Sequence, residues 1–432
     1  MSNFLKRVSL GAGANAYSQV VTIFIQLVSV PVFLSQWNLE TYGQWLILSA
    51  IPTYIALSDI GIVTVAGNRM NMLVSSGQAV EAKRVFQSAQ VFTYGMCAAI
   101  ALIAITVGLI PLFFLGGTDE KNALLLLVLS VLLGQIGGLA ESVFKATKGY
   151  AIGAALSSSA RLSEWLGYLM GLFLIGNFTA VALGGFTGRL LIVFIAFMMS
   201  SKRHSHLKWG FREARYGEIR MMLKPALSFL LFTLSNAFTF QGFTILCGAL
   251  FGPAATVVFT TYRTLARVAV QASSMLSHAL WPEFTALFAQ GRGERLGSIY
   301  KRSSLANLAI SVGLSGALFL ASGPLLTIWT HGAITLQPIL MAILLGYAAV
   351  AGCGHLPRVV LMATNNHTSL GVWFALVSLS SVALGWVLAP FLGLSGLAIA
   401  MTASEISTIG LSLIMVRNLL QNLREAKVGQ FA

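Results

Sequence analysis

Charged side chains are scarce in this 432-residue chain, because Asp, Glu, Lys and Arg together make up only 9% of it. Soluble domains carry about 25% charged residues, so this composition excludes an ordinary soluble protein. Hydrophobic residues make up 56% of the chain, and the mean hydropathy is +0.82. The sequence therefore predicts a protein that lies largely within a membrane.

The motifs of common catalytic and metal sites are also missing. The chain contains no GxxxxGK[ST] phosphate-binding loop, no HExxH, no CxxC and no GxSxG nucleophile elbow. This argues against ATP hydrolysis and predicts no catalytic residues. Histidine and cysteine are scattered without metal-ligand spacing, so we expect inert thiols, no metal and no cofactor. The residues considered are His278, His355, His367, Cys97, Cys247 and Cys353.

Acidic residues are fewer than basic ones, with 13 Asp and Glu against 27 Lys and Arg and a formal net charge of +14. Such a surplus of basic residues can indicate nucleic-acid binding or the positive-inside pattern of a membrane protein, and the positions of these residues along the chain distinguish the two. About twelve apolar segments, each long enough to cross a bilayer, divide the sequence. They are 15–35, 44–73, 86–115, 123–147, 151–176, 178–200, 222–251, 254–280, 303–330, 338–362, 369–391 and 394–416.

The basic residues gather in every second connection between these segments. The opposite connections are short and hold Glu40, Asp119, Glu120 and a single lysine, Lys121. This positive-inside pattern predicts that both termini are cytoplasmic, and it accounts for the charge without nucleic acid. The most basic connection, 201–220, could in addition contact anionic lipids.

Two stretches of the chain resemble each other. "MLVSSGQAVEAKRVF" (72–86) and "ALFAQGRGERLGSIY" (286–300) each place a glycine turn after an apolar helix, then an acid–base pair and an aromatic residue. Their separation of about 214 residues, close to half the chain, indicates a parallel duplication. We therefore expect a six-helix lobe at 1–200, a basic linker at 201–220, a second six-helix lobe at 221–417 and a tail at 418–432. The lobes should be related by a pseudo-two-fold axis along the membrane normal, with the site between them.

Seven ionisable residues fall near the middle of predicted spans, where each costs about 2.5–3.5 kcal/mol if it faces lipid. They are Asp59, Arg161, Glu164, Arg189, Arg263, Arg267 and Glu405. We expect them to face a wet cavity or one another, and the three carboxylates are candidates for H⁺ or Na⁺ coupling.

Structural roles compete with these assignments. Arg161 and Glu164 could satisfy each other on one helix, and Asp59 could pair with an arginine of another helix. Glu405 could be a protonated acid held by Thr402, Ser404 and Ser407. Arg189 has no acid nearby in its own segment and needs a partner from outside it.

Arg263 and Arg267 lie one turn apart on one helical face in "FTTYRTLARVAVQ" (259–271), with no acid on that helix before Glu283. Two like charges at this spacing repel each other. Two guanidinium groups on one stripe suit a multiply charged oxyanion such as a diphosphate, so we predict an anion site here rather than interhelical pairing.

Neutral polar residues cluster in the first span and in its counterpart in the second half. Amides and hydroxyls suit a wet path for a glycan, although polar contacts between helices would explain them as well. The candidates for a polar lumen are Asn15, Tyr17, Gln19, Gln26, Asn236 and Gln241.

The stretch 30–62, "VPVFLSQWNLETYGQWLILSAIPTYIALSDIGI", carries a proline in the first span, "YGQW" at 42–45 and "LSDIGI" at 57–62, and "GNRMN" follows at 67–71. This stretch resembles the bacterial polysaccharide-repeat flippases, the O-antigen and exopolysaccharide transporters of the multidrug/oligosaccharidyl-lipid/polysaccharide exporter superfamily. The motif-like part covers roughly the first 70 residues, while two lobes of about six spans agree over the whole chain.

The resemblance implies a V-shaped, all-α fold of twelve helices in the bacterial cytoplasmic membrane. It also implies transport of undecaprenyl-diphosphate-linked oligosaccharide to the outer leaflet, working with a polymerase and other polysaccharide-assembly proteins. The family's cationic central cavity would be supplied here by Arg161, Arg189, Arg263 and Arg267.

Two other functions compete with a flippase. A multidrug exporter of the same fold should have an acidic, aromatic-lined cavity, and four midplane arginines argue against one. An enzyme acting on lipid-linked glycans would need large outer loops, whereas the predicted outer loops have only about 5–10 residues.

Overall fold

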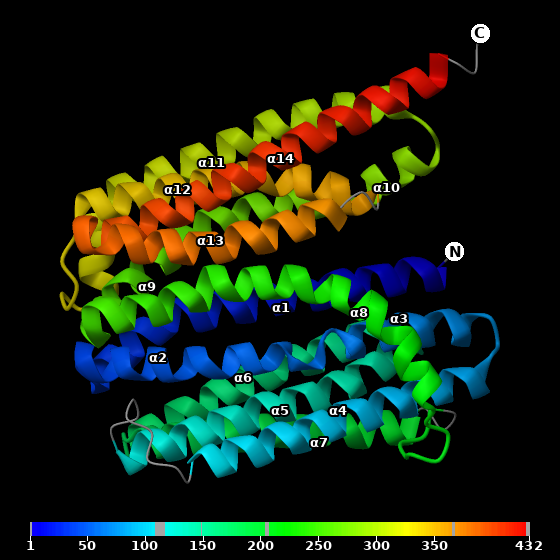
Figure 1. Cartoon of the computed structure of the whole chain (residues 1–432), viewed down its shortest axis with the longest axis horizontal. Helices are drawn as coiled ribbons and strands as arrows, with labels where there is room; N and C mark the ends of the chain where they lie inside the picture. Colours follow the sequence, from blue (N-terminus) through cyan, green and yellow to red (C-terminus); the bar gives the residue numbers. More distant parts are fainter. Residues whose placement is uncertain (1, 109–116, 148, 204–206, 365–367, 429–432) are drawn as a thin grey trace. The chain divides into compact units, whose positions relative to one another are not determined.

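The computed structural model describes residues 2–108, 117–147, 149–203, 207–364 and 368–428. The structure is 91% helical, and no strand occurs among the described residues (Figure 1). The prediction of an all-α fold is therefore confirmed. Parts of the predicted segments 86–115, 201–220 and 418–432, and His367, lie outside the described residues.

The chain forms two compact units. Unit 1 contains residues 1–38 and 44–230, and unit 2 contains 39–43 and 231–432, so the division falls within α8 rather than at 201–220. Before the division lie α1 (Ser2–Gln36), α2 (Leu39–Ile55), the 3₁₀ helix η1 (Ala56–Asp59), α3 (Ile62–Ser75), α4 (Ala79–Gly108), α5 (Thr118–Ala146), α6 (Tyr150–Leu174) and α7 (Phe178–Arg203). The remaining elements are α8 (Tyr216–Ala237), the π-helical turn η2 (Phe238–Gly242), α9 (Phe243–Ala279), α10 (Trp281–Ala289), α11 (Gly293–Trp329), α12 (Pro338–Ala363), α13 (Thr368–Leu392) and α14 (Leu394–Val428).

Ten helical segments of the described chain are long and apolar enough to cross a membrane, fewer than the predicted twelve. One difference lies at Gly252, whose φ of 83° and ψ of 176° break α9 before Pro253. The single segment Thr233–Ala279 therefore contains two helices that meet at this break, and it covers most of the predicted spans 222–251 and 254–280. The other difference is α6, which spans 25 residues but is less apolar because it carries Arg161 and Glu164.

The predicted repeat has a matching backbone geometry in the two units. Between α3 and α4, Gly77 (φ 79°) donates to Val74 O and Gln78 donates to Leu73 O. Between α10 and α11, Gly291 (φ 66°) donates to Phe288 O and Arg292 donates to Leu287 O. This is the αL-terminated turn that glycine favours at helix ends.

The buried core next to each turn repeats as well. In unit 1, α3 and α4 pack on the end of α5 through Leu139, Val143 and Ala146. In unit 2, α10 and α11 pack on the end of α12 through the same three residue types, Leu356, Val360 and Ala363. The helices α5 and α12 are therefore counterparts.

Helices α6 and α7 approach each other through glycines. A Cβ added at Gly167 would collide with the backbone of Gly184, and one added at Gly188 would collide with Ser163 O. Small residues let membrane helices pack backbone to backbone, and this close packing determines which side chains of α6 and α7 can meet.

We predict that Gly167→Val lowers the thermal stability of the detergent-solubilised protein, because overpacking of this kind costs about 1–3 kcal/mol. Gly313→Ala on α11 is the matched control, since nothing lies within 4 Å of a Cβ at that position. Equal melting temperatures for the two variants would contradict the tight α6–α7 contact.

Candidate functional site

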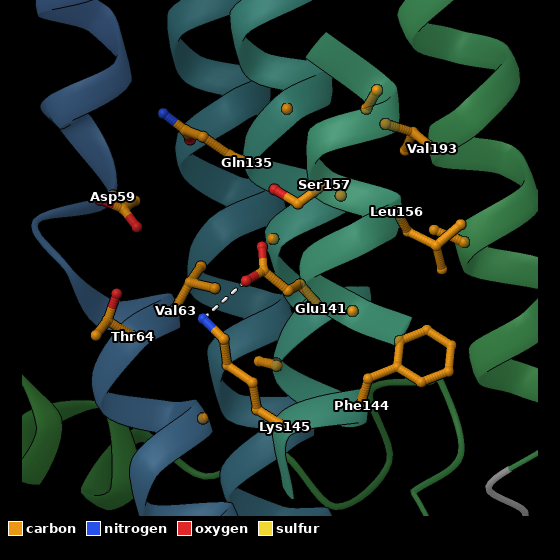
Figure 2. Close-up of a pocket in the computed structure, with 18 of the residues that line it drawn as sticks. Asp59, Val63, Thr64, Gln135, Glu141, Phe144, Lys145, Leu156, Ser157 and Val193 are labelled. Carbon is orange, nitrogen blue, oxygen red and sulfur yellow. Dashed lines mark ion pairs between the residues drawn. The ribbon is translucent and has the colours of Figure 1, made fainter. Parts of the chain in front are cut away.

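A cavity of about 400 Å³ lies in unit 1 among η1, α3, α5, α6 and α7 (Figure 2). Three of the predicted midplane residues, Asp59, Arg161 and Arg189, line it although they come from distant parts of the sequence. Glu141 and Lys145 of α5 also line it and form an ion pair at 2.8 Å. The cavity therefore gathers charges of both signs inside one unit.

Arg189 of α7 is neutralised by Glu164 of α6, with 2.9 Å between Nη2 and Oε2. Its Nη1 also donates to Ser130 O of α5 at 2.9 Å. Glu164 accepts further bonds from Ser130 Oγ at 2.6 Å and from Tyr168 OH at 3.0 Å. This network joins three helices, and it explains how two charges can persist in a membrane segment. The outside partner that the sequence required for Arg189 is Glu164.

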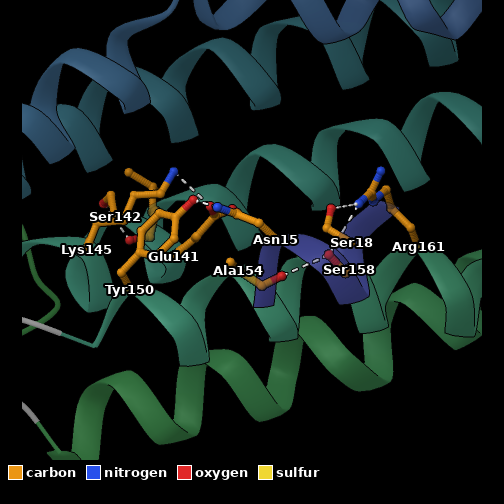
Figure 3. A network of polar contacts seen from close by, with 10 residues as sticks. Asn15, Ser18, Glu141, Ser142, Lys145, Tyr150, Ala154, Ser158 and Arg161 are labelled. Carbon is orange, nitrogen blue, oxygen red and sulfur yellow. Dashed lines mark hydrogen bonds and ion pairs between the residues drawn. The ribbon is translucent and has the colours of Figure 1, made fainter. Parts of the chain in front are cut away.

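Arg161 of α6 has hydroxyl partners instead of a carboxylate. Its Nη2 donates to Ser18 Oγ at 2.8 Å and to Ser158 Oγ at 3.2 Å (Figure 3). Its Nη1 donates to Thr22 Oγ1 at 3.2 Å. The alternative in which Arg161 pairs with Glu164 is wrong, because Glu164 is turned to Arg189. Among the described residues, no carboxylate lies within ion-pair distance of Arg161.

The polar face of α1 lies along α6. Tyr150 OH donates to Asn15 Oδ1 at 2.9 Å (Figure 3), and the hydroxyls of Tyr17 and Ser159 are 3.1 Å apart. Asn15, Tyr17 and Gln19 are exposed, and Gln26 is half-buried. Two of these four predicted lumen residues thus also hold α1 against α6.

Asp59 lies directly before a break in the second predicted span. Ile60 (φ 54°) and Gly61 (φ 80°) adopt left-handed conformations between η1 and α3, and Asp59 Oδ1 accepts the Gly61 N–H at 2.9 Å. Gln135 Nε2 of α5 donates to Ile55 O at 3.2 Å, so a side chain satisfies a carbonyl near the break. Asp59 has no arginine partner within ion-pair distance in the described part of the chain.

In unit 2, Arg263 of α9 is held by a neighbouring irregular turn. Its Nη1 donates to Phe240 O at 2.8 Å and its Nη2 to Thr244 Oγ1 at 2.7 Å. Phe240 lies in η2, and a π-helical turn leaves carbonyls free of regular i→i−4 bonding, so Phe240 O can accept from a side chain.

Arg267 is exposed, and its guanidinium carbon lies 4.7 Å from the centroid of the Phe240 ring. The same ring lies 5.7 Å from the Arg263 guanidinium carbon. Cation–π contacts favour a cation but do not neutralise it. Within the described ranges, neither arginine has a carboxylate partner, so both positive charges stay uncompensated. Asn236 is exposed on α8, and Gln241 is half-buried in η2.

Sequence reasoning missed Arg358 of α12. It forms an ion pair with Glu405 of α14, and its guanidinium carbon lies 5.5 Å from the Phe374 ring centroid. Glu405 is therefore bound to an arginine, which corrects the alternative of a protonated acid held by hydroxyls. The sequence could have identified Arg358 as a candidate, because it lies inside the predicted span 338–362.

Arg69 of α3 was missed in the same way. It lies inside the predicted span 44–73, and it pairs with Glu218 of α8 at 3.0 Å. Among the described residues, no group of three or more His, Cys, Asp and Glu is placed to hold a metal ion.

Searches with protein-family models and against curated proteins gave no match. Solved structures do match. An inward-facing multidrug resistance MATE family transporter of the MOP superfamily gives a TM-score of 0.80 at 11% identity, covering 93% of this chain and 96% of that one. The chain has a MATE-like fold. The lipid II flippase MurJ gives 0.69 at 14% identity, covering 94% of this chain and 87% of that one. The Vibrio cholerae MATE transporter VcmN gives 0.65 at 15% identity, covering 98% of each chain.

We predict that Arg189→Leu destabilises the protein by about 3–5 kcal/mol, because it leaves the Glu164 carboxylate buried without a cation. The double variant Glu164→Leu/Arg189→Leu should lose less than the sum of the two single variants, since it removes both charges together. Thermal melts of the four proteins in one detergent measure this. Additive losses would show that the two side chains do not interact.

Proposed function

We propose that the chain is a flippase that moves oligosaccharide units linked to undecaprenyl diphosphate from the cytoplasmic to the outer leaflet by alternating access. One observation carries this proposal. Arg263 and Arg267 lie in a candidate membrane span and Arg161 lies in α6, and among the described residues none of the three has a carboxylate within ion-pair distance.

Uncompensated guanidinium groups in a membrane segment are unfavourable, and they mark sites where an anion supplies the missing charge. A diphosphate carries several negative oxygens, which suit the planar donor fork of arginine. Arg267 is exposed, so other side chains of the protein do not enclose it. We assign Arg263 and Arg267 to the diphosphate.

Arg161 suits a different part of the cargo. It faces the unit 1 cavity and is bonded to Ser18, Thr22 and Ser158, so its surroundings are rich in hydroxyls. Gln135 and Ser157 line the same cavity. Such groups exchange hydrogen bonds readily with sugars, and we assign this cavity to part of the glycan.

The coupling ion, H⁺ or Na⁺, would act at one of three carboxylates. Glu164 and Glu405 are each bound to an arginine, so protonating either would leave a buried guanidinium without its counter-charge. Asp59 carries no such pair and lines the unit 1 cavity. We therefore rank Asp59 first among the coupling candidates.

The similarity to a lipid II flippase supports a lipid-linked cargo, and the similarity to MATE transporters supports transport rather than an enzymatic reaction. The proposed place of action is the bacterial cytoplasmic membrane, with both termini inside. Polymerase and other polysaccharide-assembly proteins are the proposed partners.

A multidrug exporter is the second candidate. The observation that favours it is the presence of Asp59 and Glu141 in the unit 1 cavity, since carboxylates attract cationic drugs. Glu141 is already paired with Lys145, however, which leaves one carboxylate for such a cargo.

We predict that Arg263→Gln/Arg267→Gln slows flipping of a lipid-diphosphate-linked oligosaccharide in proteoliposomes by at least about ten-fold, because charge-assisted hydrogen bonds of about 1.5–3 kcal/mol are lost. Arg263→Lys/Arg267→Lys should keep part of the rate, because the charge remains but the donor fork is lost. Arg302→Gln, an exposed site on α11, is the control. A normal rate in the double Gln variant would exclude the diphosphate site.

Cells without this protein should lose surface polysaccharide and keep their sensitivity to cationic drugs. Polysaccharide yield and inhibitory drug concentrations, measured in the same deletion strain, test this. Re-expression of the intact chain provides the control. Increased drug sensitivity with normal polysaccharide would favour the exporter instead.

A further inference from the structure

In the segment between α7 and the start of α8, the acidic and the basic side chains lie on different sides. Its acidic residues face helices of unit 1. Glu213 pairs with Lys83 of α4 at 3.7 Å, and Glu218 pairs with Arg69 of α3 at 3.0 Å. Its basic residues Lys208, Arg212, Arg215 and Arg220 are all exposed, and in the described part of the chain none of them forms an ion pair.

Exposed apolar side chains lie among these cations. The exposed fractions are 59% for Phe211, 77% for Tyr216 and 56% for Met221. We call the four basic and three apolar side chains the linker surface. Large apolar side chains that stay exposed outside membrane spans indicate a surface that meets lipid or another partner.

The backbone beneath the linker surface is fixed by buried side chains of α4. Gln87 accepts the N–H of Glu213 at 2.7 Å and donates to Lys208 O at 3.0 Å, and Ser88 Oγ accepts the N–H of Arg215 at 2.9 Å. Gln87 and Ser88 are 2% and 0% exposed.

An aromatic anchor adds to these bonds. Trp209 packs on Phe86 and Phe197 with ring centroids 5.1 and 4.8 Å away, and its Nε1 donates to Ser200 Oγ at 3.1 Å. The linker surface is thus preorganised, which reduces the entropy lost when a partner binds.

We propose that the linker surface binds anionic phospholipid headgroups. The segment follows directly on the candidate span Phe178–Lys202, so it lies at a membrane boundary. Exposed cations attract anionic headgroups, while Phe211, Tyr216 and Met221 can enter the region between headgroups and acyl chains. A soluble acidic partner would use the cations but would leave those apolar side chains unexplained.

The test uses the full-length protein in detergent and native mass spectrometry to count bound phosphatidylglycerol and phosphatidylcholine. The variant Lys208→Gln/Arg212→Gln/Arg215→Gln/Arg220→Gln should bind phosphatidylglycerol at least about ten-fold more weakly, since each basic residue near an anionic surface contributes a factor of about five. Phosphatidylcholine binding should not change.

Two further variants control for folding and for general charge. Replacing only the three arginines by lysine keeps the charges and should retain phosphatidylglycerol. Lys301→Gln/Arg302→Gln removes two exposed cations from α11, and this variant should still bind phosphatidylglycerol.

Unchanged phosphatidylglycerol binding in the four-fold variant, or an equal loss in the α11 variant, would overturn the proposal. So would normal lipid binding combined with loss of a co-purifying protein, because that result would assign the surface to a protein partner. Rates of flipping do not enter this measurement, so it can succeed or fail independently of the proposed function.

Discussion

A guanidinium group inside a membrane helix needs polar partners, because lipid cannot supply them. This requirement accounts for the local irregularities of both units. The close glycine packing of α6 and α7 lets Glu164 reach Arg189. In unit 2, the π-helical turn η2 provides the carbonyl that receives Arg263. At these two places the irregular or close-packed backbone is what accommodates a charge.

The internal duplication preserves the backbone but reverses the charges. When the two units are aligned, α7 and α14 show the same burial pattern along their length, and Arg189 occupies the position equivalent to Glu405. The shared core of α5 and α12 makes Glu141 equivalent to Arg358 in the same way. Both units thus use their last long helix to carry one member of a buried ion pair. The partner comes from α6 in unit 1 and from α12 in unit 2. A duplicated framework can therefore keep its apolar contacts while its polar network diverges, because each ion pair needs only complementarity within its own unit.

Much of the fold could be predicted from composition and periodicity, since long apolar segments and the alternation of basic loops follow directly from the bilayer. The glycine turns at Gly77 and Gly291 could also be predicted, because a left-handed residue after an apolar helix leaves a local signature. The charge partners could not. Glu164 lies three residues from Arg161 in the sequence but forms its ion pair with Arg189 of another helix. Which arginine it meets depends on how α6 is rotated about its axis against α7, and the sequence does not show this rotation. Arg358 was missed because a cation four residues before the end of a predicted span resembles a residue at the membrane boundary.

The partners of the arginines separate two roles for them. Arg189 and Arg358 have carboxylates, and each ties two helices of its own unit together. Arg161, Arg263 and Arg267 have hydroxyls, a carbonyl and aromatic rings, which orient a guanidinium but leave its charge intact. A protein that needed these groups only for stability would gain from neutralising them, as it does for the other two. Their retention as oriented cations without an ion-pair partner is the observation on which the proposed anion site rests.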